Sequence, residues 1–414
     1  MKVLKDNRFL RNLSIFLAIM GPGIITANVD NDAGGITTYS LAGAHFGYSL
    51  LWSLVPITLA LIVVQEMCAR MAVATGKGLA DLIRENFGVK VTFYFMAVLL
   101  LTNIANVMAE FAGVAAGLEI FHVSKYFSVP ISAFLVWMLV VKGNYKLVEK
   151  AFLIACLFYI SYIISGIITR PDWNTVFHEF TVPHISFKLD YFVMLVALVG
   201  TTIAPWMQFY LQASIVEKKI HAEEYQHVKL DVIGGCILAP VVAFFIVVAC
   251  ASTLHKGGIH IQTAQDAAIA LRPFAGEYAS WLFAFGLFTA SFFAASVLPL
   301  STAYCICEGM GWDTGIDKRF REAPQFFGLY TAIIIVGGGA VLIPQFPLLK
   351  IMYFSQVGNG VLLPFVLIFM LRLINNQDIM GEFVNTKSFN IIAWLTVVVT
   401  IALTVCMLVF TFTR

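Results

Sequence analysis

The chain has 414 residues, of which 60% are hydrophobic and only 12% are charged, and its formal net charge is +2. Soluble domains carry about 25% charged residues, so this composition excludes a protein whose whole surface faces water. The small net charge, without a basic cluster, gives no support for a nucleic-acid partner. We therefore expect an integral membrane protein whose apolar surface is covered by the lipid bilayer.

Apolar runs long enough to cross a bilayer recur along the whole chain. A bilayer core needs about 20 mostly apolar residues per helix. Because only short polar connectors separate the runs, we predict a single all-α transmembrane domain, 1–414, of about 11 transmembrane helices. The predicted spans cover residues 14–42, 49–70, 91–120, 128–142, 151–169, 190–216, 230–253, 279–307, 326–343, 350–373 and 389–412.

The first predicted span is interrupted near its middle. Asp30 and Asp32 stand there, followed by the pair Gly34-Gly35. An acidic side chain inside a membrane is costly, so it usually faces a cavity, a partner or an ion. Glycine and asparagine are weak helix formers, and we expect the helix to unwind across 28–35. Unwinding would free carbonyl oxygens, which are hard ligands for a cation.

The sixth predicted span is interrupted as well, at Gly200-Thr201-Thr202-Ile203-Ala204-Pro205. Pro205 cannot donate a backbone hydrogen bond and disrupts the preceding turn. Five helices separate the two breaks, so each half of a ten-helix core begins with a broken helix. This placement predicts two inverted five-helix repeats, 1–170 and 188–375, with helices 1 and 6 broken around a midplane site and with 389–412 as an extra helix.

A third polar cluster lies in the tenth predicted span, at Ser355-Gln356-Val357-Gly358-Asn359-Gly360. Gln356 has the length to reach the same cavity as the two breaks. Small residues also favour close helix packing in membranes, so a packing patch is an equally good interpretation.

The basic residues orient the predicted bundle. One set of alternate loops holds 19 of the 26 lysines and arginines, including those of the first 12 residues. Cytoplasmic loops carry the excess of basic residues. We therefore predict a multi-pass protein of the cytoplasmic membrane with its N-terminus in the cytoplasm and its C-terminus outside.

The histidines fall in loops or near the ends of the predicted spans. This position argues against an imidazole proton relay at the midplane, and solvated loop histidines are the usual case. The eight are His45, His122, His178, His184, His221, His227, His255 and His260.

Short motifs spread over most of the chain carry a family resemblance. They are Gly21-Pro22-Gly23, Ala42-Gly43-Ala44, Gly47-Tyr48-Ser49-Leu50-Leu51-Trp52, Ala74-Thr75-Gly76-Lys77, Ala109-Glu110-Phe111 and Ser355-Gln356-Val357. On these residues the chain resembles the NRAMP family of divalent metal transporters. The resemblance implies a LeuT-like fold. It also implies a metal site formed by an aspartate and an asparagine of a DPGN motif, a methionine of an MPH motif and backbone carbonyls.

The chain departs from the family pattern at these metal-binding positions. The motif aspartate falls on Asp32, but the motif asparagine is replaced by Gly35. The motif methionine is replaced by Ala204 and the histidine by Trp206. A thioether favours softer transition metals, whereas carboxylate, carbonyl and water ligands favour Mg²⁺, Ca²⁺ or Mn²⁺. With these replacements the chain resembles the magnesium transporter branch that is related to the NRAMP family.

We therefore predict a partly hydrated Mg²⁺ as the transported substrate, with Mn²⁺ also accepted and no resident cofactor. Mg²⁺ dehydrates reluctantly and is bound by only one or two carboxylates, which suits a site with few protein ligands. Thr201 falls where the family uses a backbone carbonyl, and Thr202 is expected to bond within its own helix. The predicted metal ligands are Asp32, Asp30, Thr201, Gln208 and Gln356, and the predicted cavity-lining residues are Val29, Gly35, Thr202, Ala204, Trp206 and Asn359.

The resemblance also bears on proton coupling. The family's proton-route aspartate falls on Val107, while its glutamate is kept as Glu110, which we interpret as a structural hydrogen-bonding partner. With Trp206 also non-titratable, we predict weak or absent coupling. The membrane potential would then drive import, and it is worth about 2.3 kcal/mol per charge per 100 mV, or about 4.6 kcal/mol for a divalent ion.

Three other functions compete with this interpretation. A proton-coupled Mn²⁺ or Fe²⁺ symporter keeps the ordinary family activity. A cation-coupled organic-solute symporter shares the architecture, but Asp30 and Asp32 argue against an anionic substrate group at the first break. A receptor is disfavoured by the short loops. We expect no enzyme, because no nucleophile–base pair or closed zinc ligand set occurs, and we find no sign of an obligatory protein partner.

Overall fold

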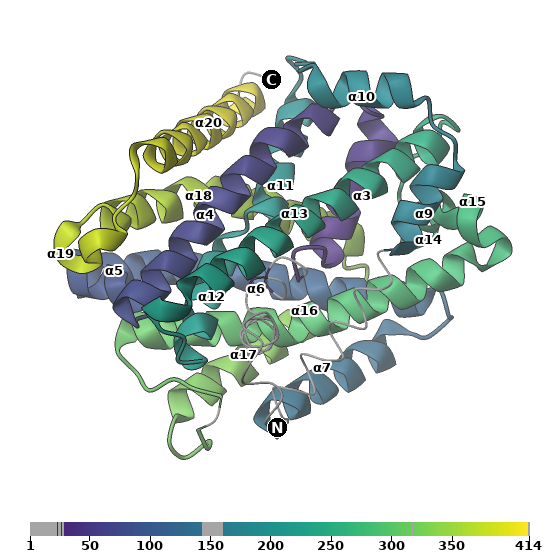
Figure 1. Ribbon diagram of the computed structural model, residues 1–414. Helices are drawn as coiled ribbons and strands as arrows, with labels where there is room; N and C mark the ends of the chain where they lie inside the picture. Colours follow the sequence, from purple (N-terminus) through teal and green to yellow (C-terminus); the bar gives the residue numbers. More distant parts are fainter. Residues whose placement is uncertain (1–22, 24–25, 27–28, 143–159, 317, 413–414) are drawn as a thin grey trace, which may run out of the picture.

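The computed structural model describes Gly23, Thr26 and residues 29–142, 160–316 and 318–412, and within these residues it contains helices and no β-strand (Figure 1). Longer helices alternate with short ones, and several single helical turns (η) join them. The α-helices are α3 (Ala33–Phe46), α4 (Leu54–Thr75), α5 (Leu79–Phe87), α6 (Val89–Glu119), α7 (Lys125–Val141), α9 (Ile160–Ile168), α10 (Trp173–Thr181), α11 (Leu189–Thr202), α12 (Pro205–Glu217), α13 (Tyr225–Cys250), α14 (Ala264–Ala268), α15 (Arg272–Ala275), α16 (Ala279–Met310), α17 (Pro324–Val341), α18 (Leu348–Ile374), α19 (Gln377–Met380) and α20 (Lys387–Phe412). The single turns are η1 (Leu51–Ser53), η3 (Ala222–Glu224), η4 (Ala251–His255), η5 (Ile269–Leu271), η6 (Gly276–Tyr278) and η7 (Gly381–Phe383).

Eight helical units of the described residues are long and apolar enough to cross a membrane. Each coincides with one predicted span, which confirms the all-helical membrane class. The predicted span 128–142 falls on α7, a shorter helix of 17 residues. The predicted first and fifth spans lie partly outside the described residues, so the total of about 11 helices and the repeats remain predictions.

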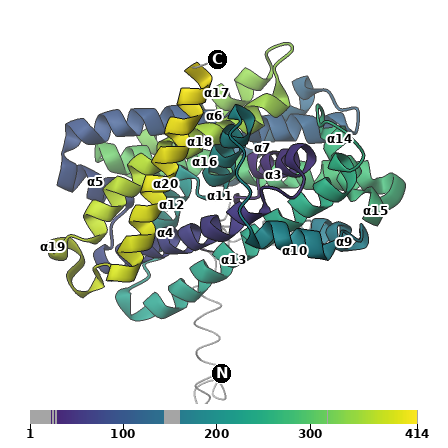
Figure 2. The same ribbon diagram turned by 90° about the horizontal axis from the view of Figure 1, so that it is seen from above.

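The centre of the bundle is formed by α3, α6, α11, α16 and α18. The two long helices α6 and α16 pack along each other, and α18 packs between α6 and α11. α3 contacts α11, α13 and α18, and the unit formed by α11 and α12 is almost wholly buried. Figure 2 shows α3 and α11 inside the bundle, and Figure 1 shows α20 at its margin. The helices that carry both predicted breaks therefore lie where an ion would be shielded from lipid.

The last helix, α20, packs on the outside of the bundle against α18, α11 and α4 (Figure 1, yellow). Its other faces expose large apolar side chains, including Ile391, Leu395 and Val398. Exposed apolar side chains of this kind suit contact with lipid. The buried face consists of Ala393, Val397, Thr400 and Met407.

A short amphipathic helix, α5, follows α4 and was not predicted. Gly76 ends α4 with a left-handed φ of 63°, which glycine adopts without steric cost. An ion pair of 2.6 Å joins Lys77 to Glu85 on the exposed face of α5. Because α5 has only nine residues, a search for runs of about 20 apolar residues cannot detect it. Its buried face consists of Leu79, Ala80, Leu82 and Ile83.

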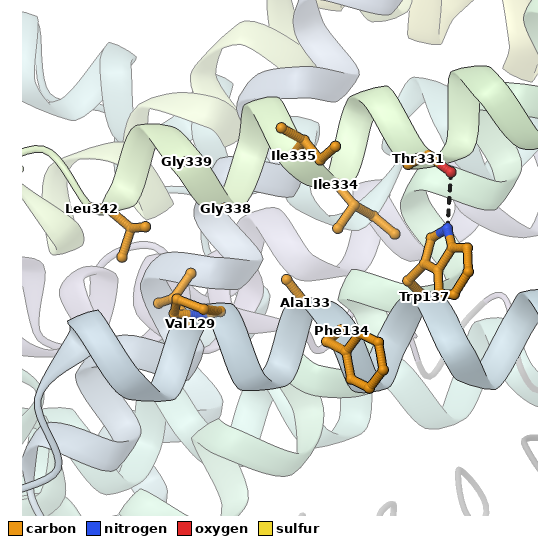
Figure 3. Close-up of a pocket in the computed structure, with 11 residues that line it drawn as sticks. Val129, Ala133, Phe134, Trp137, Thr331, Ile334, Ile335, Gly338, Gly339 and Leu342 are labelled. Carbon is orange, nitrogen blue, oxygen red and sulfur yellow. Dashed lines mark hydrogen bonds between the residues drawn. The ribbon is translucent and has the colours of Figure 1, made fainter.

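A cavity of about 380 Å³ lies between α7 and α17 (Figure 3). Val129, Phe134 and Ile334 line it, and the indole nitrogen of Trp137 donates to the Thr331 hydroxyl at 2.9 Å. No charged side chain is among its lining residues. The cavity is therefore a poor ion site. Polar side chains that can bind an ion lie instead in the interior of the bundle.

Candidate metal-ion site

The first break occurs at Asp30–Asp32. Val29 is helical, residues 30–32 form a turn, and α3 begins at Ala33. Asp32 is the N-cap of α3, and its Oδ1 accepts a hydrogen bond of 2.8 Å from the amide of Gly35. Aspartate is a preferred N-cap, and the helix dipole favours negative charge there. The predicted unwinding across 28–35 is therefore too long, because Val29 and residues 33–35 are helical. Asn28 lies outside the described residues.

The second break separates α11 from α12. α11 ends at Thr202, Ala204 has an extended backbone, and Pro205 begins α12. In a continuous helix the carbonyl of Thr201 would accept from the amide of residue 205. Proline has no amide hydrogen, so the Thr201 carbonyl loses this donor. The break therefore presents a backbone oxygen without its helical partner.

Two glycines allow the breaks to approach each other. A Cβ at Gly35 would collide with the carbonyl oxygen of Asp30 and would lie 3.4 Å from the hydroxyl oxygen of Thr201. A Cβ at Gly34 would collide with the amide nitrogen of Gln356. The structure therefore brings Asp30, Thr201 and Gln356 together around the glycines that follow Asp32.

A chain of amides fixes Gln356. Asn359 Nδ2 donates to Gln356 Oε1 at 2.9 Å, and Gln356 Nε2 donates to the Ser355 hydroxyl at 3.2 Å. Asn359 also forms a reciprocal pair with Asn106 of α6, with hydrogen bonds of 2.9 and 3.1 Å. An amide oxygen has two lone pairs, so Gln356 Oε1 keeps one for an ion or a water molecule.

Three buried acidic side chains gather at the start of α3. Asp30 Oδ2 has no hydrogen-bond partner among the described residues. Glu110 Oε2 accepts from the amide of Ala33 at 3.3 Å, which places Glu110 next to the turn that Asp32 caps. The ion pairs found among the described residues do not involve any of these acids. Buried carboxylates without a counter-charge are costly, and a bound cation would remove that cost.

The predicted residues of α12 make contacts of another kind. The neighbouring groups assign the orientation of the Gln208 side-chain amide, because its nitrogen must face the nearby acceptors. In that orientation the nitrogen donates to the carbonyls of Ala204 and Pro205 at 2.5 and 2.7 Å. The ring of buried Trp206 lies 6.3 Å from that of Tyr210, and the Trp206 carbonyl accepts from Ser301 at 3.3 Å. The described contacts of Gln208 thus stay within α12 and its N-cap residue, and those of Trp206 within α12 and α16, whereas Gln356 reaches the first break.

Thr202 bonds within its own helix, as expected. Its hydroxyl donates to the carbonyl of Leu198 at 2.8 Å and forms a second hydrogen bond of 2.8 Å with the hydroxyl of Tyr39. Tyr39 lies on α3, so this pair ties the second half of the first broken helix to the end of α11.

The donor set is dominated by oxygen. Among the described residues no group of three or more His, Cys, Asp or Glu side chains is placed to hold a metal ion. Carbonyl, carboxylate and amide oxygens are instead the groups that surround the two breaks. Such a set suits hard cations, which tolerate water in the remaining positions.

Comparison with known proteins places this arrangement in a family. The family described as natural resistance-associated macrophage protein-like, or Nramp, matches residues 23–410. The chain belongs to the Nramp family.

This Nramp chain is similar to proteins named divalent metal cation transporter MntH. It is 26% identical to that of Deinococcus radiodurans over 408 residues, which cover 95% of this chain and 90% of the relative. It is also 26% identical to that of Yersinia pestis (strain Pestoides F) over 409 residues, which cover 95% of each chain.

Solved structures share the fold. A manganese transporter of Eremococcus coleocola, in complex with an aromatic bis-isothiourea compound, has a TM-score of 0.79 at 22% identity, over 95% of this Nramp chain and 86% of that chain. Mhp1, a nucleobase-cation-symport-1 family transporter in a closed conformation, has a TM-score of 0.59 at 13% identity, over 95% and 92%. At these identities the likenesses establish the fold alone, a helical architecture that the chain shares with both structures.

Two polar residues of the Nramp chain near this site escaped the sequence analysis. Asn106 holds Asn359, and Asn103 on the same face of α6 donates to the Thr302 hydroxyl at 3.0 Å. Asn103, Asn106 and Glu110 follow the i, i+3, i+7 spacing of one helical face within an apolar span. That spacing is the signal that would have found them.

Proposed function

We propose that this protein imports a divalent metal ion, with partly hydrated Mg²⁺ as its main substrate and Mn²⁺ as a second one. Alternating access of a LeuT-like fold would carry the ion, with weak or no proton coupling. The relatives named divalent metal cation transporters support the ion class. The membrane potential would supply about 4.6 kcal/mol per 100 mV for the entry of a divalent ion.

The observation that carries the proposal is the set of oxygen atoms that meet where the two breaks come together. Asp32 caps α3, the Thr201 carbonyl lacks its helical donor, and Gln356 Oε1 retains a lone pair. The family's methionine position is occupied by Ala204, which provides no sulfur. Mg²⁺ usually retains several waters and is held by one or two carboxylates, which matches so few direct ligands.

The second candidate is a proton-coupled Mn²⁺ or Fe²⁺ symporter. The position of Glu110 favours it, because this buried carboxyl adjoins the start of α3 and its Oε1 has no partner among the described residues. A carboxyl in that position has the means to take up a proton when the ion leaves. The fold similarity to Mhp1 adds no support for an organic substrate, and Asp30 and Asp32 argue against an anionic one.

The test is ion uptake into proteoliposomes that contain a Mg²⁺-sensitive dye, with a pH-sensitive dye in parallel. We compare the native protein with Asp32→Asn and with Asp172→Asn. Asp172 is an exposed N-cap of α10, where asparagine caps equally well, so it is a matched control. We expect Mg²⁺ entry that falls at least tenfold only in Asp32→Asn, without acidification. Mn²⁺ entry with acidification and no Mg²⁺ entry would contradict the proposal and favour the symporter.

A further inference from the structure

Two histidine rings that are 215 positions apart in the sequence meet at one end of the bundle. His45 lies in the last turn of α3, and His260 lies in the segment between η4 and α14. Their ring centroids are 5.7 Å apart and the ring planes are inclined by 62°. Both side chains are exposed, so water and dissolved ions reach them.

The backbone beneath this pair is held by a third histidine. The Nδ1 atom of His255 lies 3.0 Å from the carbonyl oxygen of Ala44, the residue before His45. The same ring packs against Gly47, where a Cβ would come within 3.1 Å of it. His255 thus fastens the end of α3 to the end of η4.

The segment that carries His260 is fixed as well. Asp266 Oδ2 accepts hydrogen bonds from the amides of Gln262 and Thr263 at 3.0 and 2.8 Å. The side chain of Thr263 caps α14 in return, through the amide of Asp266 at 3.3 Å. Both histidines therefore project from backbone that is held within two or three residues of them.

The pair borders an open cavity. His45 lines a space of about 950 Å³ together with His184, Lys188 and Asp190. Lys188 and Asp190 contribute opposite charges, so the cavity has no strong excess of either sign. A divalent ion approaching His45 from this side meets one carboxylate and one ammonium group.

We propose that His45 and His260 form a second metal site, which binds a borderline transition ion such as Zn²⁺ or Ni²⁺. Zinc lies about 2.0–2.1 Å from an imidazole nitrogen, so two imidazoles on one tetrahedral ion place their ring centroids roughly 5 Å apart. A small side-chain movement from 5.7 Å reaches this geometry. Water would complete the coordination, because no third His, Cys, Asp or Glu side chain among the described residues completes a cluster here.

The chemistry of this pair differs from that of the oxygen-rich site. Imidazole nitrogen suits zinc, nickel and copper, whereas Mg²⁺ prefers oxygen and keeps its waters. An excess of Mg²⁺ therefore occupies the site at the breaks without competing for the histidines. A two-imidazole site binds its ion reversibly, because two of the four positions of a zinc ion remain with water.

An ion held between the histidines would restrain α3. Asp32 caps the start of this half-helix and His45 lies in its last turn, so a link from His45 to the segment before α14 ties the ion-binding half-helix to its surroundings. We expect Zn²⁺ to slow transport without entering the transport site. This consequence rests on the proposed function, whereas the binding itself does not.

The binding experiment uses the full-length purified protein and isothermal titration with Zn²⁺ in excess Mg²⁺. We expect His45→Ala and His260→Ala each to weaken Zn²⁺ binding about tenfold or more. His184→Ala is the matched control, because this histidine lines the same cavity without joining the pair. Unchanged binding in both variants, or an equal loss in the control, would overturn the site.

A double variant separates a shared ion from two independent effects. If one ion bridges the rings, His45→Ala/His260→Ala binds no more weakly than either single variant, whereas independent effects add. Size-exclusion profiles like that of the native protein show that each variant is folded. Additive losses would contradict a shared site.

The transport experiment measures Zn²⁺ inhibition of Mg²⁺ uptake in proteoliposomes. We expect the inhibiting concentration to rise about tenfold in either single variant and to stay unchanged in His184→Ala. Pair-dependent Zn²⁺ binding in a protein that takes up no Mg²⁺ would overturn the proposed function and leave the site standing. Pair-dependent binding without any effect on measurable Mg²⁺ uptake would overturn the restraint on α3.

Discussion

The side-chain amide of Gln356 occupies the space into which a Cβ at Gly34 would project. α18 thus meets the first break through a contact that requires glycine. Gly200 extends the same contact on the other side, because a Cβ there would collide with the Gln356 carbonyl. The position of Gln356 is therefore set by the absence of side chains on two neighbouring helices.

Gly34→Ala is expected to displace Gln356 and to reduce Mg²⁺ uptake at least tenfold. Forcing a methyl group into a well-packed interior costs about 1–3 kcal/mol, so the variant should still fold. Gly358→Ala is the control on α18, because its Cβ would meet only Thr102 at 4.0 Å. Uptake by proteoliposomes and size-exclusion profiles decide the outcome. Equal uptake by the two variants would show that Gln356 has no part in transport.

Asp32→Asn is expected to abolish stabilisation of the protein by Mg²⁺. A ligand that binds only the folded state at about 100 times its Kd adds about 2.7 kcal/mol. The native protein should therefore melt at a higher temperature in Mg²⁺, and Asp32→Asn should not. Asparagine keeps the N-cap hydrogen bond to Gly35, so the variant removes charge and leaves the helix start intact. A full Mg²⁺ shift in Asp32→Asn would place the ion elsewhere.

Asn106→Ala is expected to raise the KM for Mg²⁺ more than it lowers kcat. Asn106 acts through Asn359, which holds Gln356 Oε1. Removing one partner leaves buried amide groups of Asn359 unpaired, at a cost of about 1–3 kcal/mol. Because the pair is reciprocal, Asn106→Ala and Asn359→Ala should be non-additive in KM. Additive effects would show that the two amides act separately.

Part of this site could be predicted from sequence. The two helix breaks could be predicted because the residues that cause them act on their own backbone and need no distant partner. These residues are Asp32, the glycines after it and Pro205. The partner of Asn106 is 253 positions away and that of His45 is 215 positions away, and no local pattern indicates either contact. The Gln208 amide donates to the carbonyls of Ala204 and Pro205, which precede it by four and three residues. The presence of an amide in a membrane helix did not distinguish this local bonding from a place in the ion site.

The fold shows the same division. Long apolar runs predicted α6, α16, α18 and α20 to within a few residues, because lipid contact demands that composition. The short helix α5 follows a different rule, since it needs only one apolar face.

Asp266 is expected to make the segment before α14 sensitive to acid. Partial burial acts to raise the pKa of Asp266, but the amides of Gln262 and Thr263 and the Thr263 hydroxyl together lower it below its ordinary value. A lowered folded-state pKa means that this contribution to stability is present above the unfolded value, about 3.9, and is lost as the pH falls below it. As the pH is lowered from 7 to below about 3.9, the apparent melting temperature should fall more steeply in the native protein than in Asp266→Asn. Parallel curves would show that the carboxylate contributes nothing.

Ala204→Met is expected to make the protein sensitive to Cd²⁺. A thioether at the start of α12 would add a soft ligand to an oxygen-rich site, and soft ligands favour softer ions over Mg²⁺. Ala204→Leu is the control, because leucine and methionine have similar volumes and only methionine carries sulfur. We expect Cd²⁺ to inhibit Mg²⁺ uptake at least tenfold more strongly in the methionine variant than in the leucine variant. If both variants keep Mg²⁺ uptake and Cd²⁺ inhibits them equally, residue 204 does not face the ion, and the preference for Mg²⁺ must come from Asp32, Thr201 and Gln356 alone.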